Sequence, residues 1–239
     1  MITFSINIVD KTIHIKAFNE TTKRYCSAFL TDEEPDCEIT MTEEDLKNER
    51  TNSSDGKVYV NEEISALYRK IADLLVEKGI IVFHSSSFCV DGYAFLVTAR
   101  SGVGKSTHAR LLQEYLGDKF QYINDDKPLL EVKEDNVEVF STPWNGKERR
   151  GNNIHAPLKA IIFLNRGLDN TYRKIDNKEE IYIKMLSQIY LQKEKSKREK
   201  ALKVADTLLK NVNFYEINVN QDIDAAKMTY ERIIRNEIK

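Results

Sequence analysis

The sequence lacks the features that would place the chain in a membrane, in an oxidising compartment or on a nucleic acid. No apolar run approaches the ~20 residues that span a bilayer. The three cysteines form no CxxC pair, which argues against a disulfide framework and a zinc site. A net charge of −2 gives no electrostatic reason to expect a nucleic-acid or membrane partner. The N-terminus alternates apolar and polar residues like a strand, not a signal peptide, so we expect a cytoplasmic protein.

What the chain does have is an ordinary globular composition, with 41% hydrophobic and 31% charged residues. Its length fits one domain, or one domain with a small appendage. Alternating apolar side chains between Phe4 and Ile15 predict a β-hairpin, and helical spacing predicts a helix over 62–78 that ends at Gly79. The polar segment 31–57 predicts one short strand and then a mobile loop.

From residue 80 onward, strand-like and helical segments alternate, which predicts an α/β domain with a mixed sheet. Asp91-Gly92 between two apolar runs is a strong hairpin signal. The other expected strands cover 120–124, 158–165 and 214–219, with a hairpin over 129–140, and the expected helices cover 105–116, 178–209 and the end of the chain. We therefore expect a small β-plus-helix region, residues 1–80, packed on a larger domain, residues 81–239, with one single domain as the alternative.

The stretch TARSGVGKSTHARLL has the layout of a loop that binds nucleotide phosphates. A buried strand precedes it and a helix follows it, and Gly102 and Gly104 let backbone N–H groups close around oxygens. Lys105 would reach the β- and γ-phosphates, and Ser106 would ligate Mg²⁺, with Thr107 as the next hydroxyl. The residues predicted to bind the nucleotide are Ala99, Arg100, Ser101, Gly102, Val103, Gly104, Lys105, Ser106 and Thr107.

Ala99 is the irregular position, because the usual motif begins with glycine there. Alanine can leave the strand tightly if its φ stays negative, so the substitution is compatible with a working loop. The simpler explanation is a strand–loop–helix connection that happens to contain Gly-Lys-Ser.

Two adjacent carboxylates, Asp125 and Asp126, follow the expected strand 120–124. A right-handed crossover would put that strand in the same sheet as the loop, and ligands bind at the C-terminal ends of such strands. Phosphoryl transfer needs a carboxylate for the metal and a group that takes the acceptor's proton. The simpler explanation is an Asx turn, for which Asn-Asp-Asp-Lys-Pro is well suited.

Of the four histidines, His84 is the candidate for a role in the site. His84 ends an apolar strand just before the hairpin that leads to the loop, where it would come close to Asp125 and orient or tune it; a structural role is the alternative. His14 and His155 are expected in structural or surface roles, and His108 on the exposed side of its helix.

The turn-rich segment STPWNGKERRG concentrates cations in one loop. Arginines near a transferring phosphate stabilise charge in the transition state, which makes Lys147, Arg149 and Arg150 candidates for a substrate-facing surface. The alternative is a surface loop in which Trp144 fills the edge of the core.

The order of these motifs resembles the HPr kinase/phosphorylase family, which is related to the ATP-dependent phosphoenolpyruvate carboxykinases. The resemblance covers about residues 84–166 and rests on TARSGVGKST, on INDDKP about twenty residues later, and on HSSSFCVDG upstream. It implies a mixed-sheet P-loop kinase domain with ATP and Mg²⁺ as cofactors. Three departures mark a short, divergent relative: Ala99, Thr107 where an acidic residue is usual, and TPWNGKERRG in place of the HPr kinase signature. HPr is therefore not the expected substrate, and carboxykinase activity is not expected of a chain this short.

Carried over residue by residue, the resemblance implies specific roles. The loop backbone and Lys105 would bind the phosphates of ATP, and Ser106 and Asp126 would hold Mg²⁺. Asp125 would be the general base on an acceptor hydroxyl, its pKa raised by its neighbour, with His84 assisting. The roles of the two aspartates could be exchanged.

The resulting hypothesis is an ATP- and Mg²⁺-dependent kinase that phosphorylates a hydroxyl, chiefly serine of a peptide or protein, or else a small molecule. One rival is a nucleotide-binding regulatory protein with little transfer activity. Another is a small-molecule kinase with a basic lid, for which residues 192–200 are the candidate, although a solvated helix end is the simpler interpretation of that segment. We expect no nucleic-acid or membrane partner, and self-association of the chain stays open.

Overall fold

The computed structural model describes residues 1–50 and 60–239. The chain divides into two compact units, Met1–Lys78 and Gly79–Lys239, which are described separately below. Within the described ranges, no helix is both long and apolar enough to cross a membrane.

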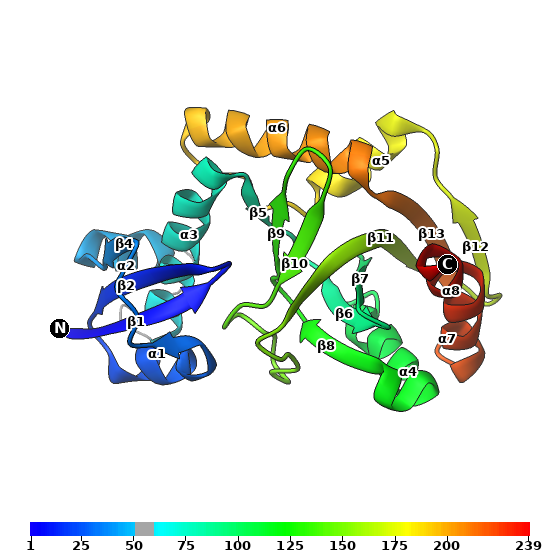
Figure 1. Cartoon of the computed structure of the whole chain (residues 1–239), viewed down its shortest axis with the longest axis horizontal. Coiled ribbons are helices and arrows are strands. Elements are labelled where there is room, and N and C mark those ends of the chain that lie inside the picture. The colour runs from blue at the N-terminus through cyan, green and yellow to red at the C-terminus, as the bar shows by residue number, and fades with distance from the viewer. Residues whose placement is uncertain (51–59) are drawn as a thin grey trace. The chain divides into compact units, whose positions relative to one another are not determined.

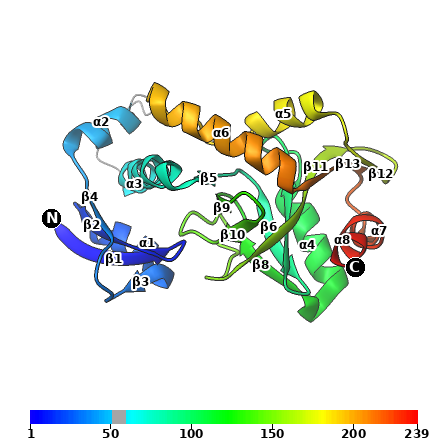
Figure 2. The same ribbon diagram turned by 45° about the horizontal axis from the view of Figure 1, so that its top comes forward.

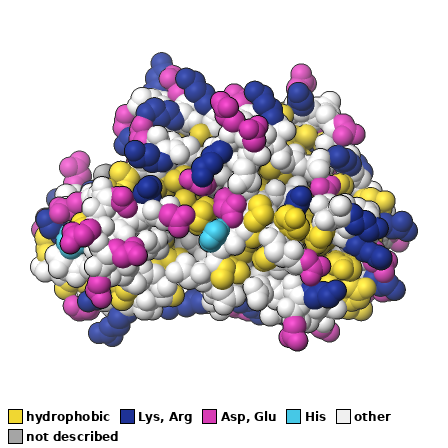
Figure 3. Space-filling view, viewed as in Figure 1, with side chains coloured by type: hydrophobic (Ala, Val, Ile, Leu, Met, Phe, Trp, Pro, Cys, Tyr) yellow, Lys and Arg dark blue, Asp and Glu magenta, His cyan; other side chains and the backbone are white. Residues whose placement is uncertain are grey.

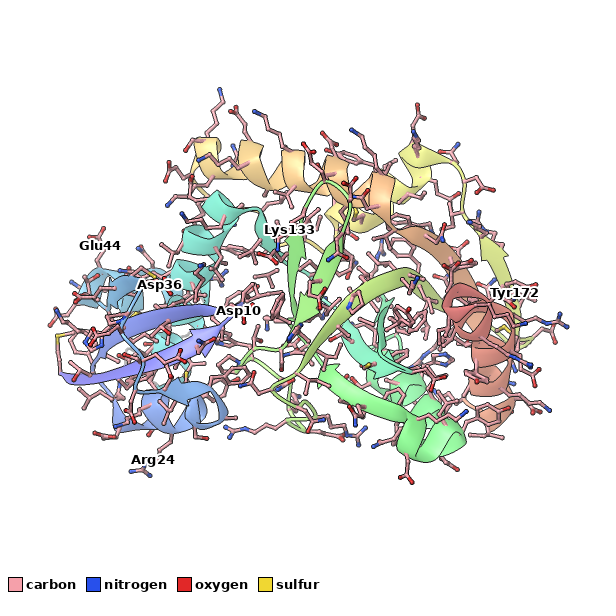
Figure 4. The ribbon with its side chains drawn as sticks, viewed as in Figure 1. Asp10, Arg24, Asp36, Glu44, Lys133 and Tyr172 are labelled. Carbon is pink, nitrogen blue, oxygen red and sulfur yellow. The ribbon has the colours of Figure 1, made fainter. Side chains whose placement is uncertain are left out.

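The described part of the first unit is a four-stranded sheet, in the order β3-β1-β2-β4, with the α-helices α1, α2 and α3 (Figure 1). Its elements are β1 (Ile2–Ile8), β2 (Lys11–Ala17), α1 (Glu20–Tyr25), β3 (Leu30–Thr31), β4 (Cys37–Thr40), α2 (Glu43–Arg50) and α3 (Val60–Leu75). The predicted hairpin is confirmed, since β1 and β2 pair antiparallel around Val9 and Asp10, each with φ of 53°. Figure 4 labels Asp10 at the tip of this hairpin.

The segment 31–57 was expected to hold one short strand and then a loop; the strand is confirmed, and the loop is wrong for residues 43–50. A helix, α2, follows β4 where a loop was predicted. Thr42 and Asp45 form a reciprocal cap: Asp45 N–H donates to Thr42 Oγ1 at 3.2 Å, and Thr42 N–H donates to Asp45 Oδ2 at 2.7 Å. Acidic residues in the first turn also suit the helix dipole. Glu44 in that turn is labelled in Figure 4; the end of the predicted loop, 51–59, lies outside the described residues.

The second unit is a nine-stranded mixed sheet with helices on both faces, which confirms the predicted mixed α/β class (Figures 1 and 2). Its strands are β5 (Ile80–Val82), β6 (Ser86–Val90), β7 (Tyr93–Thr98), β8 (Phe120–Asn124), β9 (Leu129–Val132), β10 (Val137–Phe140), β11 (His155–Arg166), β12 (Thr171–Lys174) and β13 (Asn213–Val219). Its helices are α4 (Lys105–Leu116), α5 (Lys178–Leu186), α6 (Lys195–Asn211), α7 (Ile223–Thr229) and α8 (Arg235–Ile238), with a π-helical turn, Tyr230–Ile234, between the last two.

Strand directions bring three C-terminal strand ends to one edge of this sheet. β7 runs parallel to β11 and antiparallel to β6, and β6 runs antiparallel to β8. Strands β7, β8 and β11 therefore point the same way. The loop before α4, the Asp125-Asp126 pair and Arg166 follow or end these strands. This common edge is the place where open α/β sheets bind ligands.

Two helical layers cover the sheet. One buried cluster joins α4 and α7 to β6, β7, β8, β11 and β13. It includes the stacked rings of Phe88 and Phe120, whose centroids lie 4.7 Å apart. On the opposite face, Lys184 of α5 lies over the ring of Phe163 in β11, with 5.7 Å between Nζ and the ring centroid. Figure 2 shows α5 and α6 together on one side and α4, α7 and α8 on the other.

Two details of the second unit differ from the sequence-based expectation. The helix expected over 178–209 is two helices, α5 and α6, separated by residues 187–194. The strand β12 was not expected, because all four of its residues are exposed and none alternates with a buried one; Tyr172 on it is labelled in Figure 4. The basic segment 192–200 agrees with its simpler interpretation as a solvated helix end, since it includes the first turns of α6 and basic and acidic side chains mix on this surface (Figure 3).

His108 is buried, and its expected place on the exposed side of α4 is wrong. The residue is 2% exposed, and its Nε2 lies 3.0 Å from Thr229 Oγ1 of α7. Burial lowers the pKa of His108 to about 4. The helix α7 covers this side of α4, which residues within α4 do not reveal.

Candidate active site

An open pocket of about 450 Å³ lies at the common C-terminal edge of β7, β8 and β11. Five chain segments line it: the segment between β5 and β6, the loop before α4 with the first turn of that helix, the Asp pair, the loop after β10, and the end of β11. The lining residues are His84, Ser101, Gly102, Gly104, Lys105, Ser106, Thr107, Asp125, Asp126, Gly146, Lys147, Glu148 and Arg166.

The loop before α4 presents backbone to the pocket. Gly102 and Gly104 have φ of 79° and 123°, and a Cβ added to either would meet no atom within 4 Å. Gly104 is the N-cap of α4 and provides no side chain to cap it, so the helix begins with free N–H groups and the positive end of its dipole beside the pocket. Ala99 is 7% exposed and is not among the residues with positive φ. It therefore meets the condition of a negative φ under which alanine is compatible with a working loop.

The remaining predicted loop residues have different surroundings. Ser101, Ser106 and Thr107 line the pocket, whereas Arg100 and Val103 are not among its lining residues. The backbone of both takes part in the loop, since Val103 N–H donates to the Arg100 carbonyl at 3.3 Å.

Lys105 lines the pocket and is 9% exposed. Its Nζ donates a 3.0 Å hydrogen bond to the Ala99 carbonyl. Burial lowers the pKa of Lys105, and the negative charges of Asp126 and Asp125 oppose that shift. A buried ammonium group that is only partly compensated is well suited to receive an anion.

Asp125 is held by two serine hydroxyls. Ser86 Oγ donates to Asp125 Oδ1 at 2.6 Å, and the Ser106 side chain also hydrogen-bonds this carboxylate. The pKa of Asp125 is raised by burial, against the lowering effect of both hydroxyls. Desolvation of the carboxylate is therefore the principal cause of the raised pKa, in place of the neighbouring aspartate that was expected to raise it.

His84 faces Asp126 and not Asp125, contrary to the expected contact. His84 Nε2 lies 3.5 Å from Asp126 Oδ1, and Lys127 Nζ lies 2.7 Å from Asp126 Oδ2. Burial and then the charge of Lys105 lower the pKa of His84, while Asp126 and a side-chain hydrogen bond to Gln188 oppose this. The histidine and the second aspartate thus form a pair that lines the pocket.

The Asx turn proposed as the simpler explanation for the Asp pair is also present. Asn124 Oδ1 accepts hydrogen bonds from Asp126 N–H at 2.9 Å and from Lys127 N–H at 2.7 Å. The Asn124 amide in turn donates to Thr142 Oγ1 at 3.0 Å. This turn directs the two adjacent carboxylates to different partners, so turn and pocket are compatible.

The loop after β10 contributes less charge than predicted. Lys147 lines the pocket with Gly146 and Glu148, whereas Arg149 and Arg150 are not among its lining residues. Arg150 forms an ion pair with Glu148, and its guanidinium carbon lies 5.9 Å from the centroid of the Tyr122 ring.

Two residues of that loop fix its place. Trp144 is 5% exposed, as expected of a residue that fills the edge of the core. Gly146 has φ of 62°, and a Cβ there would lie 3.4 Å from the Asp125 carbonyl oxygen, so only glycine lets the loop approach the Asp pair unstrained.

The sequence interpretation missed three residues that shape the site. Arg166 lines the pocket from the end of β11, Gln188 hydrogen-bonds the ring of His84, and Ser86 holds Asp125. For Arg166 a signal existed, since it directly follows a predicted buried strand, 158–165, at the edge where ligands bind. For Gln188 and Ser86 none existed, because their partners lie far away in the sequence.

Among the described residues, no group of three or more His, Cys, Asp or Glu side chains is arranged to hold a metal ion by itself. Mg²⁺ commonly takes one or two protein oxygens and completes its shell with phosphate oxygens and waters. The Ser106 hydroxyl and the Asp125 carboxylate, which contact each other at the pocket, fit such a partial site.

Comparison with known proteins adds little. No protein-family model matches the sequence, and no curated protein matches it. Among solved structures, the chain is similar to the Hpr(Ser) kinase/phosphatase from Coxiella burnetii, with 13% identity, a TM-score of 0.41, and coverage of 66% of this chain and 90% of that one. This likeness is distant, so the functional conclusion below rests on the site itself.

Proposed function

We propose that the second unit binds ATP with Mg²⁺ and transfers the γ-phosphoryl group to a hydroxyl, with a serine of a peptide or protein as the acceptor class. One observation carries the proposal. The buried Lys105 at the uncapped start of α4 and the hydrogen-bonded pair of Ser106 and Asp125 line one pocket with a second carboxylate, Asp126. These are the groups that phosphoryl transfer requires.

The contacts favour an exchange of the roles first assigned to the two aspartates. Ser106 contacts Asp125, so these two would hold Mg²⁺, which neutralises phosphate charge when bound. Asp126 lies beside His84 and is 25% exposed through its side chain, which leaves it accessible to an acceptor. Asp126 is therefore our candidate general base, and His84 the group that assists it.

The proposed step balances as a displacement at phosphorus. The acceptor hydroxyl gives its proton to the Asp126 carboxylate as its oxygen bonds to the γ-phosphorus. The bond from that phosphorus to the β–γ bridging oxygen breaks, and ADP leaves. Lys105 and the first N–H groups of α4 stabilise the negative charge on the phosphates throughout.

Two substitutions separate binding from transfer. Asp126→Asn should retain magnesium-dependent ATP binding and lose most label transfer from γ-labelled ATP, because only the proton acceptor is removed. Asp125→Asn should lose the magnesium dependence of ATP binding. Asp118→Asn, an exposed aspartate in the turn after α4, is the matched control and should change neither.

The acceptor search uses serine peptides and small hydroxyl compounds in parallel. Label on a serine peptide supports the proposed acceptor class, and label only on a small molecule overturns that part. Tight magnesium-dependent ATP binding with no transfer to any acceptor favours the rival, a nucleotide-binding regulatory protein. The lid of a small-molecule kinase finds no support, because residues 192–200 contribute nothing to the pocket lining.

A further inference from the structure

Arg166 holds the loop before α4 by two consecutive carbonyl groups. Its Nε donates to the Val103 carbonyl at 2.8 Å, and its Nη2 donates to the Gly102 carbonyl at 3.0 Å. The two donors belong to one planar guanidinium group, so the pair of bonds fixes the orientation of two adjacent peptide groups. Arg166 also lines the pocket, although its side chain takes no part in the chemistry described above.

The sheet register explains how a residue 63 positions away reaches this loop. Thr98, the last residue of β7, pairs with Phe163 of β11, and β11 continues for three more residues to Arg166. The end of β11 is anchored on its other side, where Arg166 pairs with Val219 of β13 and Gly167 N–H donates to the Val219 carbonyl at 3.0 Å. The arginine therefore extends from a fixed strand over the loop that follows the neighbouring strand.

Peptide geometry links this clamp to the pocket. In a planar trans peptide, the C=O and the following N–H point in opposite directions, and no cis peptide occurs among the described residues. Holding the Gly102 carbonyl orients the N–H of Val103, which is already used in its bond to the Arg100 carbonyl. Holding the Val103 carbonyl orients the N–H of Gly104, which borders the pocket.

We propose that Arg166 is a positioning residue: by clamping the Gly102 and Val103 carbonyls it turns the Gly104 N–H toward the phosphates of a bound nucleotide. The inference rests on the proposed function, because it names the residue that preorganises the same site. A fixed donor costs no reorganisation when the anion arrives, which is why preorganisation strengthens binding.

The test compares two variants. Arg166→Met removes both the charge and the two hydrogen bonds to the loop, whereas Arg166→Lys keeps the charge but cannot donate from two nitrogens of one planar group. Arg110→Met is the matched control, because Arg110 is also a partly exposed arginine and its contact is an ion pair within α4. Calorimetry should show that both Arg166 variants bind ATP with Mg²⁺ about tenfold more weakly than wild type. Arg110→Met should bind like wild type.

Two binding outcomes overturn the clamp. Wild-type affinity in Arg166→Lys together with a loss in Arg166→Met would mean that charge alone matters. Unchanged affinity in both variants would mean that Arg166 does not position the loop for binding.

Backbone amide NMR of the ATP-free protein keeps this inference separate from the proposed function. The amide resonance of Gly104 should shift in both Arg166 variants and not in Arg110→Met. If wild type binds no ATP, the proposed function fails, and the Gly104 resonance alone decides whether the clamp exists. If the Gly104 amide resonance is unchanged in both Arg166 variants, the clamp is overturned, whether or not the protein binds ATP.

Discussion

Ser86 Oγ donates a 2.6 Å hydrogen bond to Asp125 Oδ1, and the two residues, 39 positions apart in sequence, are both buried. They meet because β6 and β8 are hydrogen-bonded neighbours in the sheet. The hydroxyl therefore stabilises a carboxylate that burial alone would tend to protonate. This contact joins the fold of the second unit to the chemistry of its pocket.

Ser86→Ala should destabilise the second unit by about 2 kcal/mol near neutral pH, because a buried charged group loses a hydrogen bond. Ser87→Ala is the matched control: its hydroxyl, equally buried, donates to the neutral Asn124 carbonyl at 2.9 Å, so its loss should cost about 1 kcal/mol at any pH. Urea unfolding followed by the fluorescence of Trp144, the single tryptophan, measures both.

The loss of stability in Ser86→Ala should depend on pH. Burial raises the pKa of Asp125 above its unfolded value, so this group's contribution to stability falls as pH rises from the unfolded pKa through the folded pKa. Removing Ser86 raises the pKa further. The stability difference between Ser86→Ala and wild type should therefore grow with rising pH, and a difference that is constant with pH would contradict the assignment.

Lys105 and Gln188 should shift the pKa of His84 in opposite directions. The charge of Lys105 lowers this pKa, so Lys105→Met should raise it. The hydrogen bond that the His84 ring donates to the Gln188 side chain raises it, so Gln188→Leu should lower it. NMR titration of the imidazole protons measures both. Lys195→Met, at an ammonium group 82% exposed on α6, should leave the titration of His84 unchanged. An equal pKa of His84 in wild type and in Lys105→Met would mean that the two residues do not share one pocket.

His108 should make the second unit sensitive to acid. Its pKa of about 4 lies below its ordinary 6.5, so the folded state binds fewer protons than the unfolded state between these values. Stability is full above the ordinary pKa and should fall as pH drops toward 4, by on the order of 3 kcal/mol in total. His108→Gln should remove this dependence, and His155→Gln, at a side chain 57% exposed, should not.

Gly104→Ala should lose stability and ATP binding together, because φ of 123° strains an L-residue and the strain falls on the loop that faces the phosphates. Gly117→Ala provides the comparison: its φ is 56°, it also has open space around it, and it follows α4 at the end away from the pocket. Both should lose about 1 kcal/mol or more of stability. Equal loss of nucleotide affinity in the two would indicate a general effect of strain.

Local chemistry explains which parts of the fold were predictable. Asp91-Gly92 forms the predicted hairpin turn, with φ of 50° and 86°, because few residues adopt two successive positive φ angles. Gly117 ends α4 as expected. The helix α2 carried a local signal too, the capping pair Thr42 and Asp45, which an acidic, polar composition obscured.

Long-range contacts decide the features that the sequence did not predict. The burial of His108 depends on Thr229, 121 residues later, and the clamp by Arg166 depends on the register of β11 against β7. Which of the two adjacent aspartates faces His84 is decided by the turn at Asn124, and no property of the pair in isolation distinguishes them. Sequence spacing could thus identify the candidate residues, but it could not predict which residues each of them contacts in the folded structure.

The fluorescence of Trp144 tests the central claim most directly. This buried residue lies two positions before Gly146 of the pocket lining, so occupation of the pocket should change its emission. Titration with ATP in the presence of Mg²⁺ should give a saturable change in wild type and in Lys195→Met, with affinity at least about tenfold weaker in Lys105→Met. Equal ATP affinity in wild type and Lys105→Met would contradict the assignment of this pocket as a nucleotide site.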